Sequence, residues 1–561
     1  MKITGSDALI RCLLKEDVTT IFGYPGGAIM PIYDALYDYE KKINHILTRH
    51  EQGAIHAAQG YARVSRNVGV CFATSGPGAT NLITGLNDAL MDSTPIVCIT
   101  GQVPSNLLGT DAFQESDVIG ISMPVTKWNY QITKSDEIPE IIAKAFYITK
   151  SGRPGPVLID ITKDAQFSKM DFKYKKCEKI RSYHPYPILK LDEINKAAKI
   201  INQAKKPLIL VGQGVTISNA EDEVLKLAEI SNTPIASTLL GLSAVKCDHQ
   251  LYVGYLGMHG NYGPNIKTNE CDVLIAIGMR FDDRVTGDVS KYASQAKIIH
   301  IEIDPSEINK IIKTDAPINA DAKQALVSLI PKIKKNEHKE WVEEFYECNK
   351  IEFEKITNNE FNHNGKEIKM AEVIKILSDY TNGESIIVTD VGQHQMTTSR
   401  YYKFKKSNSN VTSGGLGTMG FALPASMGAK LGNPIREVIG VIGDGGIQMT
   451  IQELATISQF NIGVKILILN NNFLGMVRQW QELFFDNRYS FTKMENPDFQ
   501  LISKGYGVES NKVSERKKLK DSIKKFVDYK GPYLLEVVVE KEENVFPMVP
   551  SGESISNIRL E

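Results

Sequence analysis

The chain has 561 residues, of which 42% are hydrophobic and 23% charged, so its composition is that of an ordinary globular protein. At roughly 150 residues per domain, this length predicts three or four domains. A formal net charge of −1 gives no general attraction for nucleic acid or for a membrane surface.

The start of the chain and the cysteines predict a cytoplasmic protein. The N-terminal stretch mixes charged and apolar residues at helical spacing and lacks the uninterrupted apolar core of a signal peptide. No apolar run in the sequence approaches the roughly 20 residues needed to cross a bilayer. The seven cysteines are scattered without a CxxC pair, which argues against a zinc site or a disulfide framework.

In chain order, the first predicted domain spans residues 1–166. Short apolar runs alternate in it with helical patterns, which is typical of parallel strands covered by helices. The runs are Asn44–Leu47, Gly69–Ala73, Ile96–Ile99 and Val157–Asp160. A charged stretch follows, so we expect residues 167–190 to form a linker.

The same alternation recurs twice more. A second domain is expected over 191–335, and the polar stretch 336–366 predicts another linker. A third domain is expected over 367–540, followed by a C-terminal tail, 541–561. The fold class is therefore α/β, with three doubly wound parallel-sheet domains, and the similar first and third blocks could share one fold.

The stretch 443–472 carries the strongest chemical signal. One apolar run ends in Gly443-Asp444-Gly445, a helical pattern follows, and a second apolar run ends in three asparagines that include Asn471. In a strand–helix–strand unit both strand ends lie on one side of the sheet, so Asp444 and Asn471 should lie close together. Their oxygens suit a divalent cation that holds a diphosphate, and the pattern resembles the thiamine diphosphate motif, GDG followed by NN.

Glu51 follows a predicted strand and has two interpretations. The zinc protease motif HExxH fails here, because position 54 is Ala. A lone glutamate in such a turn is most often a helix cap or a solvated charge. Thiamine diphosphate, however, needs one carboxylic acid against its aminopyrimidine for removal of the thiazolium proton, and Glu51 could supply it.

The segment Gly415–Gly420 has the GxGxxG spacing. As a dinucleotide fingerprint it is weak, because no apolar strand directly precedes it. The simpler interpretation is a turn before a helix. Beside a thiamine cofactor the same loop would let backbone carbonyls approach the aminopyrimidine, with Met419 either packed in the core or wedged between the two rings.

The second domain carries signals for an adenine dinucleotide. An apolar strand leads into Gly212-Gln213-Gly214, which alone is a weak sign, and another strand ends in acids that include Glu302. Arg280 lies in a polar stretch after a third strand. On physical grounds, a nucleotide-binding domain and a domain without a nucleotide stay equally open.

Three further positions are open on composition alone. Lys163 and Gln114 are polar loop residues. Trp480 is one of only three tryptophans and lies within a turn or two of the proposed cation site. A tryptophan nevertheless belongs more often to the core than to a ligand pocket.

The order of the motifs resembles one family. RHEQGA, SGPGATN, GTDAFQE, TKWN and GRPGPVLID precede GMHG and RFDDRVTG, and TDVGQHQM, SGGLGTMG, GDG and LGMVRQWQ follow. From about Gly5 to Pro550, the chain resembles the large catalytic subunits of the acetolactate synthase family, also called acetohydroxyacid synthases.

The resemblance implies a pyrimidine-binding domain, a central FAD-binding domain and a diphosphate-binding domain, with thiamine diphosphate, Mg²⁺ and FAD as cofactors. The implied catalytic residues are Glu51, Gln114, Lys163 and Met419. The implied thiamine diphosphate contacts are Glu51, Gln393, His394, Gly417, Met419, Gly443, Asp444, Gly445, Asn471 and Met476, and the metal ligands are Asp444, Asn471 and the carbonyl of Phe473. The implied FAD contacts are Arg153, Gly212, Gly214, Met258, His259, Arg280, Glu302 and Asp321, and the substrate contacts are Phe113, Arg280, Val477 and Trp480.

The resemblance also implies a reaction and an assembly. Pyruvate would lose CO₂, and its two-carbon unit would pass to a second pyruvate, giving 2-acetolactate, or to 2-ketobutyrate, giving 2-aceto-2-hydroxybutyrate. This is the first common step of valine, leucine and isoleucine biosynthesis. A homodimer or tetramer with active sites shared between chains is implied, as is a small regulatory subunit. The alternatives are a pyruvate oxidase-like enzyme and a non-catalytic paralogue.

The chain departs from the family pattern at several positions. Gly446-Ile447 stands where Ser-Phe is usual, Thr162 where Pro is usual, and the stretch Lys403–Asn410 lacks the usual Pro-Arg. None of these departures removes a catalytic group, so the expected reaction type is unchanged.

Overall fold

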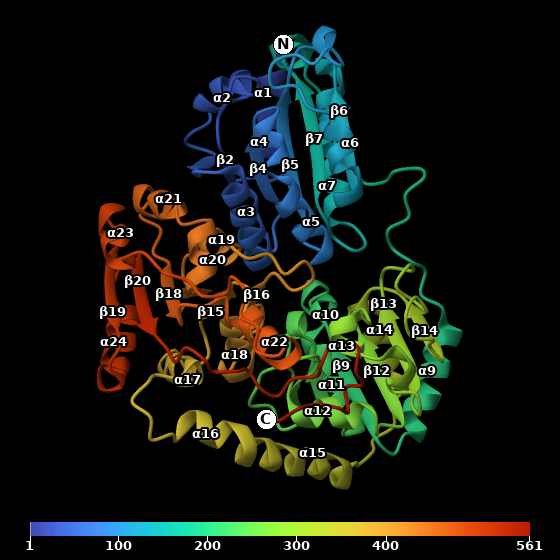
Figure 1. Cartoon of the computed structure of the whole chain (residues 1–561). Coiled ribbons are helices and arrows are strands. Elements are labelled where there is room, and N and C mark those ends of the chain that lie inside the picture. The colour runs from blue at the N-terminus through green and yellow to red at the C-terminus, as the bar shows by residue number, and fades with distance from the viewer. Residues whose placement is uncertain (1) are drawn as a thin grey trace.

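Three six-stranded parallel sheets, each flanked by helices, make up the chain (Figure 1). The structure is a computed structural model that describes residues 2–561. The predicted α/β class with three parallel-sheet domains is confirmed. No helix of the described residues is long and apolar enough to cross a membrane.

The first domain has the strand order β3-β2-β4-β5-β7-β6. The strands are β2 (Thr20–Gly23), β3 (Asn44–Leu47), β4 (Gly69–Ala73), β5 (Ile96–Gln102), β6 (Trp128–Ile132) and β7 (Val157–Thr162). Every residue of β4, β5 and β7 is buried, because helices cover both faces of the sheet. These helices include α1 (Gly5–Lys15), α3 (Glu51–Ser65), α5 (Ile83–Met91) and α7 (Ile138–Lys150).

The middle domain has the strand order β11-β10-β9-β12-β13-β14. The strands are β9 (Pro207–Val211), β10 (Ile235–Ser237), β11 (Tyr252–Tyr255), β12 (Val273–Ile277), β13 (Lys297–Glu302) and β14 (Ala316–Asn319). Numbered within the domain, this is the order 3-2-1-4-5-6 of dinucleotide-binding sheets. The helices α9 (Leu191–Gln203), α11 (Glu221–Ser231) and α14 (Ala322–Leu329) pack on it.

The third domain repeats the topology of the first. Its order is β16-β15-β17-β18-β20-β19, so both domains read 2-1-3-4-6-5 when numbered internally. The shared fold suggested by the sequence is therefore confirmed. The strands are β15 (Ile386–Thr389), β16 (Asn410–Thr412), β17 (Val438–Gly443), β18 (Lys465–Asn470), β19 (Glu509–Val513) and β20 (Tyr533–Val538). The helices used below are α18 (Gln393–Tyr401), α19 (Ala422–Gly432), α20 (Asp444–Met449), α21 (Glu453–Gln459) and α22 (Gly475–Phe484).

The segments between the sheets are more ordered than their polar composition predicts. Within 167–190, β8 (Lys169–Asp171) pairs antiparallel with β1 (Lys2–Thr4). Within 336–366, α15 (Lys339–Glu352) lies below the middle and third domains (Figure 1). The tail after residue 540 crosses to the middle domain, where the Val549 N–H donates to the Met258 carbonyl at 2.8 Å.

The first and third domains share one apolar core, which α3 and α19 join. The two helices meet backbone to backbone at glycines. An ideal Cβ on Gly60 would lie 1.9 Å from the Ala425 carbonyl oxygen, and one on Gly428 would lie 1.8 Å from the Ala57 carbonyl oxygen. The close packing of α3 on α19 fixes the first sheet relative to the third, and polar residues follow the carboxyl ends of the strands in both sheets.

Candidate functional site

Asp444 and Asn471 lie at the ends of adjacent strands. Asp444 follows β17 and begins α20, Asn471 follows β18, and the two strands are parallel neighbours. Both side chains are buried. Burial raises the pKa of Asp444 to about 6, while hydrogen bonds from Asn496 and from backbone N–H groups oppose the rise. Among residues 2–561, no Lys, Arg or His forms an ion pair with Asp444, so this buried carboxylate lacks a cationic partner in the chain.

Asn496 completes this strand end and was not predicted from the sequence. Its Nδ2 lies 2.6 Å from Asp444 Oδ2, 3.0 Å from Asn470 Oδ1 and 3.2 Å from Asn472 Oδ1. An amide NH₂ has two hydrogens, so it cannot satisfy three oxygens together. Three side-chain oxygens thus converge on one amide group, and oxygen atoms are the ligands that a hard cation prefers.

Gln393 and His394 begin α18 and border the same place. The Asn471 amide donates to Gln393 Oε1 at 3.3 Å, and a Cβ on Gly475 would lie 2.1 Å from that oxygen. A Cβ on Gly443 would come within 2.9 Å of the His394 ring. Burial lowers the pKa of His394 to about 3, and its Nε2 has no hydrogen-bond partner among the described residues. We call Gln393, His394, Asp444 and Asn471 the strand-end set.

The predicted residues that flank the strand-end set lie on neighbouring turns. Phe473 lies between Asn471 and α22, and its N–H donates to Asn471 Oδ1 at 3.1 Å. A Cβ on Gly445 would lie 3.6 Å from Met419 Cε, which brings the glycine-rich loop close to this strand end. Gly417 has a φ of +72° and only one atom, 4.0 Å away, near its Cβ position. The loop therefore presents a bare backbone surface at this point.

Glu51 lies in the first domain, at the start of α3. It is 8% exposed, and Asn81 Nδ2 donates to its Oε2 at 2.9 Å. The preceding turn is held by the third domain: both carboxylate oxygens of Glu453 accept the Arg49 N–H, at 3.0 and 3.2 Å. Burial raises the pKa of Glu453 to about 7, against the lowering effect of Thr456 and the backbone N–H groups. Glu453, like Asn496, was not predicted from the sequence.

Phe113, Gln114 and Lys163 belong to the same domain as Glu51. Phe113 is 88% exposed, Gln114 has a φ of +58° beside Gly76, and Lys163 begins the short helix α8 (Lys163–Phe167). We call Glu51, Phe113, Gln114 and Lys163 the N-terminal set. Among residues 2–561, no hydrogen bond or ion pair joins the N-terminal set to the strand-end set. One chain thus carries two groups of site residues that neither a hydrogen bond nor an ion pair connects.

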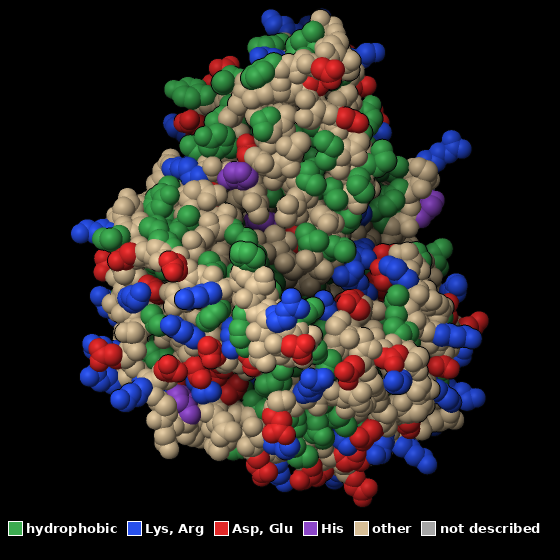
Figure 2. All heavy atoms as spheres, in the orientation of Figure 1, with side chains coloured by type: hydrophobic (Ala, Val, Ile, Leu, Met, Phe, Trp, Pro, Cys, Tyr) green, Lys and Arg blue, Asp and Glu red, His purple; other side chains and the backbone are tan. Residues whose placement is uncertain are grey.

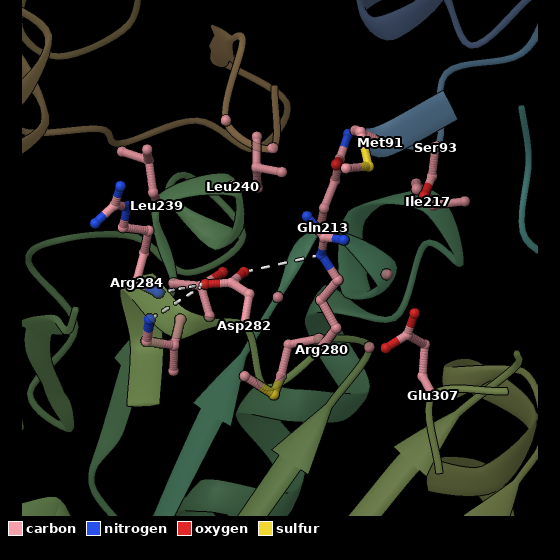
Figure 3. Close-up of a pocket in the computed structure, with 18 of the residues that line it drawn as sticks. Met91, Ser93, Gln213, Ile217, Leu239, Leu240, Arg280, Asp282, Arg284 and Glu307 are labelled. Carbon is pink, nitrogen blue, oxygen red and sulfur yellow. Dashed lines mark hydrogen bonds and ion pairs between the residues drawn. The ribbon is translucent and has the colours of Figure 1, made fainter. Parts of the chain in front are cut away.

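A cavity of about 630 Å³ lies where the three domains meet. Figure 3 shows part of its wall, with Arg280 and Asp282 facing each other and with Met91 and Ser93 reaching in from the first domain. All eight residues predicted to contact FAD line this cavity, namely Arg153, Gly212, Gly214, Met258, His259, Arg280, Glu302 and Asp321. Gly417, Met476 and Trp480 also line it. The glycines sit where side chains would collide, since a Cβ on Gly212 would lie 2.3 Å from the Gly278 carbonyl oxygen.

Charged side chains of both signs line the cavity. Burial raises the pKa of Glu302 to about 7, although the Asp304 N–H and the Arg153 charge oppose the rise. Arg280 Nε lies 3.8 Å from Asp282 Oδ2, and its Nη2 lies 3.0 Å from the Cβ position of Gly415. Arg280 thereby spans from the middle domain to the glycine-rich loop of the third.

Trp480 and Val477 lie on α22, beside this cavity. The Arg284 guanidinium stacks 5.9 Å from the centre of the Trp480 ring. Trp480 Nε1 is buried and has no hydrogen-bond partner among the described residues, and Val477 is half exposed. The tryptophan is therefore part of the cavity wall.

The departure at Gly446 has a structural counterpart. A Cβ at this position would lie 1.6 Å from Asp390 Oδ2, so the serine usual in the family would collide unless Asp390 turned. Asp390 Oδ2 has no hydrogen-bond partner among the described residues, and burial raises the pKa of Asp390 to about 7. The chain has thus changed the packing next to the strand-end set while keeping its polar residues.

Comparisons with known proteins agree with this arrangement. The N-terminal TPP binding domain of thiamine pyrophosphate enzymes matches residues 3–121, their central domain matches 194–329, and their C-terminal TPP binding domain matches 390–537.

Similar proteins match almost from end to end. A probable acetolactate synthase large subunit of Methanocaldococcus jannaschii is 46% identical over 99% of this chain and 95% of its own. The acetolactate synthase large subunit of Lactococcus lactis is 43% identical over 98% and 95%, and the isozyme 2 large subunit of Escherichia coli is 42% identical over 99% of each. The chain therefore belongs to the thiamine pyrophosphate enzymes and, among them, to the acetolactate synthase large subunits.

Proposed function

We propose that the chain catalyses the acetolactate synthase reaction, the decarboxylation of pyruvate followed by transfer of its two-carbon unit to a second 2-keto acid. The products are 2-acetolactate from pyruvate and 2-aceto-2-hydroxybutyrate from 2-ketobutyrate, in branched-chain amino acid biosynthesis. The observation that carries the proposal is the pairing of Asp444 and Asn471 at adjacent strand ends, in a chain that matches such enzymes over its full length.

A divalent cation such as Mg²⁺ fits the strand end. The Asp444 carboxylate, the Asn471 amide oxygen and the Phe473 carbonyl would hold it, and these are the oxygen ligands that Mg²⁺ prefers. The fit rests on the buried Asp444 carboxylate, which has no cationic partner among residues 2–561, and on the side-chain oxygens that converge around Asn496. Gln393 and His394 would flank the diphosphate that the cation binds.

Thiamine diphosphate, when bound, supplies the carbon nucleophile and the electron sink for loss of CO₂. The chain would supply position, proton handling and exclusion of water. Glu51 would share a proton with the pyrimidine ring, and its hydrogen bond from Asn81 would orient the carboxyl group. Gln114 and Lys163 would hold the reacting keto acid, and Met419 would pack against the cofactor.

FAD fits the cavity between the domains. The middle sheet has a dinucleotide-binding strand order, Gly212 and Gly214 leave room for close backbone approach, and the buried Glu302 at a strand end suits ribose hydroxyls. Arg153 would add a positive charge near the phosphates. The flavin would be held without taking part in electron transfer.

A second copy of the chain would complete each active site. Among residues 2–561, no hydrogen bond or ion pair joins the N-terminal set to the strand-end set, and Glu51 of one protomer would serve the cofactor held by another. Figure 2 shows hydrophobic side chains at the surface over the upper part of the molecule, whereas charged ones prevail lower down. Phe113 in the first domain and Phe491 in the third are 88% and 99% exposed, so both are available for contact with another chain. A homodimer or tetramer is therefore proposed.

A small regulatory subunit is the second proposed partner, because the relatives are named large subunits. The formal net charge of −1 gives no reason to propose binding to nucleic acid or to a membrane. From the N-terminal stretch and the scattered cysteines, we propose that the protein is cytoplasmic.

Product analysis tests the proposal. The purified chain, with thiamine diphosphate, Mg²⁺ and FAD, should convert pyruvate to acetolactate, and added 2-ketobutyrate should divert product to acetohydroxybutyrate. The Glu51→Gln variant should fold but lose about 10²–10⁴-fold in rate, the scale of an acid–base group. Glu40→Gln, which removes an exposed carboxylate from the same domain, should leave the rate unchanged.

Two results would contradict the proposal. Near-normal turnover of Glu51→Gln would show that this carboxylate is not the acid–base group of the reaction. Consumption of O₂ in step with pyruvate, with formation of peroxide in place of acetolactate, would identify a pyruvate oxidase-like enzyme.

A further inference from the structure

Two buried aspartates of the first domain face the glycine loop of the third, which we define as Ser413–Met419. Asp88 lies on α5 and Asp92 caps its end, so the two carboxylates stand one helical turn apart on one side of the helix. Their exposed fractions are 0% and 1%. Neither residue belongs to the strand-end set or to the N-terminal set.

Asp92 holds the beginning of the loop. Its Oδ2 accepts the Gly414 N–H at 2.9 Å, and its Oδ1 accepts the Gly415 N–H at 2.7 Å. Arg63 Nη2 lies 2.7 Å from Oδ2 and balances the charge inside the protein. The same arginine donates through Nη1 to the carbonyl of Thr412, just before the loop.

Asp88 holds the two ends of the loop together. The hydroxyl of Ser413 donates to Asp88 Oδ1, and the hydroxyl of Thr418 donates to the same oxygen at 3.1 Å. The Thr418 N–H donates to Ser413 Oγ at 2.8 Å, which closes the loop at its base. The loop is thus anchored at positions 413, 414, 415 and 418.

The tip of the loop has no such support. Gly417, with its φ of +72°, lines the large cavity, and only one atom, 4.0 Å away, is near its Cβ position. The position of the tip is therefore set by its anchored base, and through the base by Asp88 and Asp92. An asparagine could not replace Asp92, because both oxygens of that carboxylate accept hydrogen bonds, whereas an amide has one oxygen and a donor NH₂. At Asp88 both hydroxyls donate to the same oxygen, so removal of its anchor requires an alanine.

We propose that Asp88 and Asp92 are positioning residues, which fix the tip of the glycine loop against the ring portion of thiamine diphosphate. The inference rests on the proposed function, since it takes the loop as part of the cofactor site. The first domain would then serve two cofactors, that of its own chain through Asp88 and Asp92 and that of its partner through Glu51.

The test compares two ligands of the full-length protein in the presence of Mg²⁺. Thiamine diphosphate would touch both the loop and the strand-end set, whereas inorganic diphosphate would reach only the latter. We expect Asp92→Asn and Asp88→Ala to raise the Kd of thiamine diphosphate at least about tenfold, as for the loss of charged hydrogen bonds. The Ki with which inorganic diphosphate displaces the cofactor should stay within about twofold of wild type.

Glu352→Gln provides the matched control. Glu352 is a buried carboxylate that accepts from Arg400 and from the Tyr262 N–H at another domain boundary, away from the loop. The Glu352→Gln variant should leave the Kd of thiamine diphosphate and the Ki of inorganic diphosphate unchanged. Its melting temperature should fall about as much as those of the two aspartate variants. If the aspartate variants do not fold, Ser413→Ala removes one anchor and should shift the constants in the same direction, less strongly.

Two outcomes would overturn the inference: an unchanged Kd for thiamine diphosphate, or an equal loss for both ligands, which a general loss of stability would produce. Failure of the proposed function would look different. In that case the wild-type protein would bind thiamine diphosphate without forming acetolactate, whatever the variants did.

Discussion

A single methyl group at Gly428 should force the first and third domains apart. An ideal Cβ there would lie 1.8 Å from the Ala57 carbonyl oxygen, whereas ordinary contacts begin near 3.4 Å, so α3 and α19 would have to separate by more than 1 Å. Overpacking of this kind costs about 1–3 kcal/mol, and more where backbone atoms collide. The helix itself would gain about 1 kcal/mol from Gly→Ala.

The net effect of Gly428→Ala should therefore be a loss of about 2 kcal/mol or more, because a backbone carbonyl cannot turn aside as a flexible side chain can. For a domain of this size, that corresponds to a fall in melting temperature of about 4–8 °C. Calorimetry of the cofactor-free protein would measure it. Gly505→Ala is the matched control, since Gly505 ends a helix of the same domain and has no atom within 4 Å of its Cβ position.

The double variant sharpens the test. A Cβ on Gly60 would lie 1.9 Å from the Ala425 carbonyl oxygen, in the same helix crossing. Once one methyl group has separated the helices, the second should cost less, so the double variant should lose less stability than the sum of the two single losses. An unchanged melting temperature for Gly428→Ala, or full additivity, would refute the packing argument.

Two further predictions concern buried charges at domain boundaries. Because the pKa of Glu453 is raised to about 7 in the folded state, its carboxylate destabilises the fold progressively from about pH 4.5 to pH 7, by up to roughly 3 kcal/mol. The melting temperature of Glu453→Gln relative to wild type should therefore rise between pH 5 and pH 7.5, and a constant difference would contradict the assigned burial. Arg400→Met should lower the melting temperature by an amount equivalent to about 3–5 kcal/mol, because Glu352 is left buried without its cation, and Arg400→Met/Glu352→Gln should recover most of the loss. A double variant no more stable than Arg400→Met would show that the pair is not coupled.

The fully buried strands could be predicted from sequence because of where they lie. Strands buried on both faces must be apolar throughout, so each appears as one short run, and the run Gly69–Ala73 has the same bounds as β4. Polar residues that directly follow such runs, as Asp444 and Asn471 do, must meet at one edge of a parallel sheet. The two side chains of the cation site therefore follow from the order of residues along the chain.

Composition was misleading between residues 336 and 366. The segment is polar overall, yet α15 buries Trp341, Phe345 and Cys348 at helical spacing against the middle domain. The Trp341 indole N–H also donates to the Pro207 carbonyl at 2.8 Å. The apolar positions were visible in the sequence, but a narrow buried stripe contributes little to the average polarity of a surface helix.

Other residues could not be found from sequence at all. Asn496, Glu453 and Asp92 act on segments that the chain brings together only in three dimensions, and Asp92 lies more than 320 positions from the Gly414 and Gly415 N–H groups that it accepts. No periodicity or spacing rule connects such distant segments. The allocation of individual residues to FAD or to substrate likewise came from family resemblance, since a cavity lined by three domains has no signature in any one of them.

That cavity gives the molecule a thermodynamic property of its own. Its walls come from all three domains, so none of them alone presents a complete binding surface. A ligand that fills it acts on the equilibrium between assembled and separated domains, and the assembly is favoured by RT ln(1 + [L]/Kd). The arrangement of the catalytic domains would then depend on how much of that ligand the cell holds, even though the ligand forms no bond with the substrate.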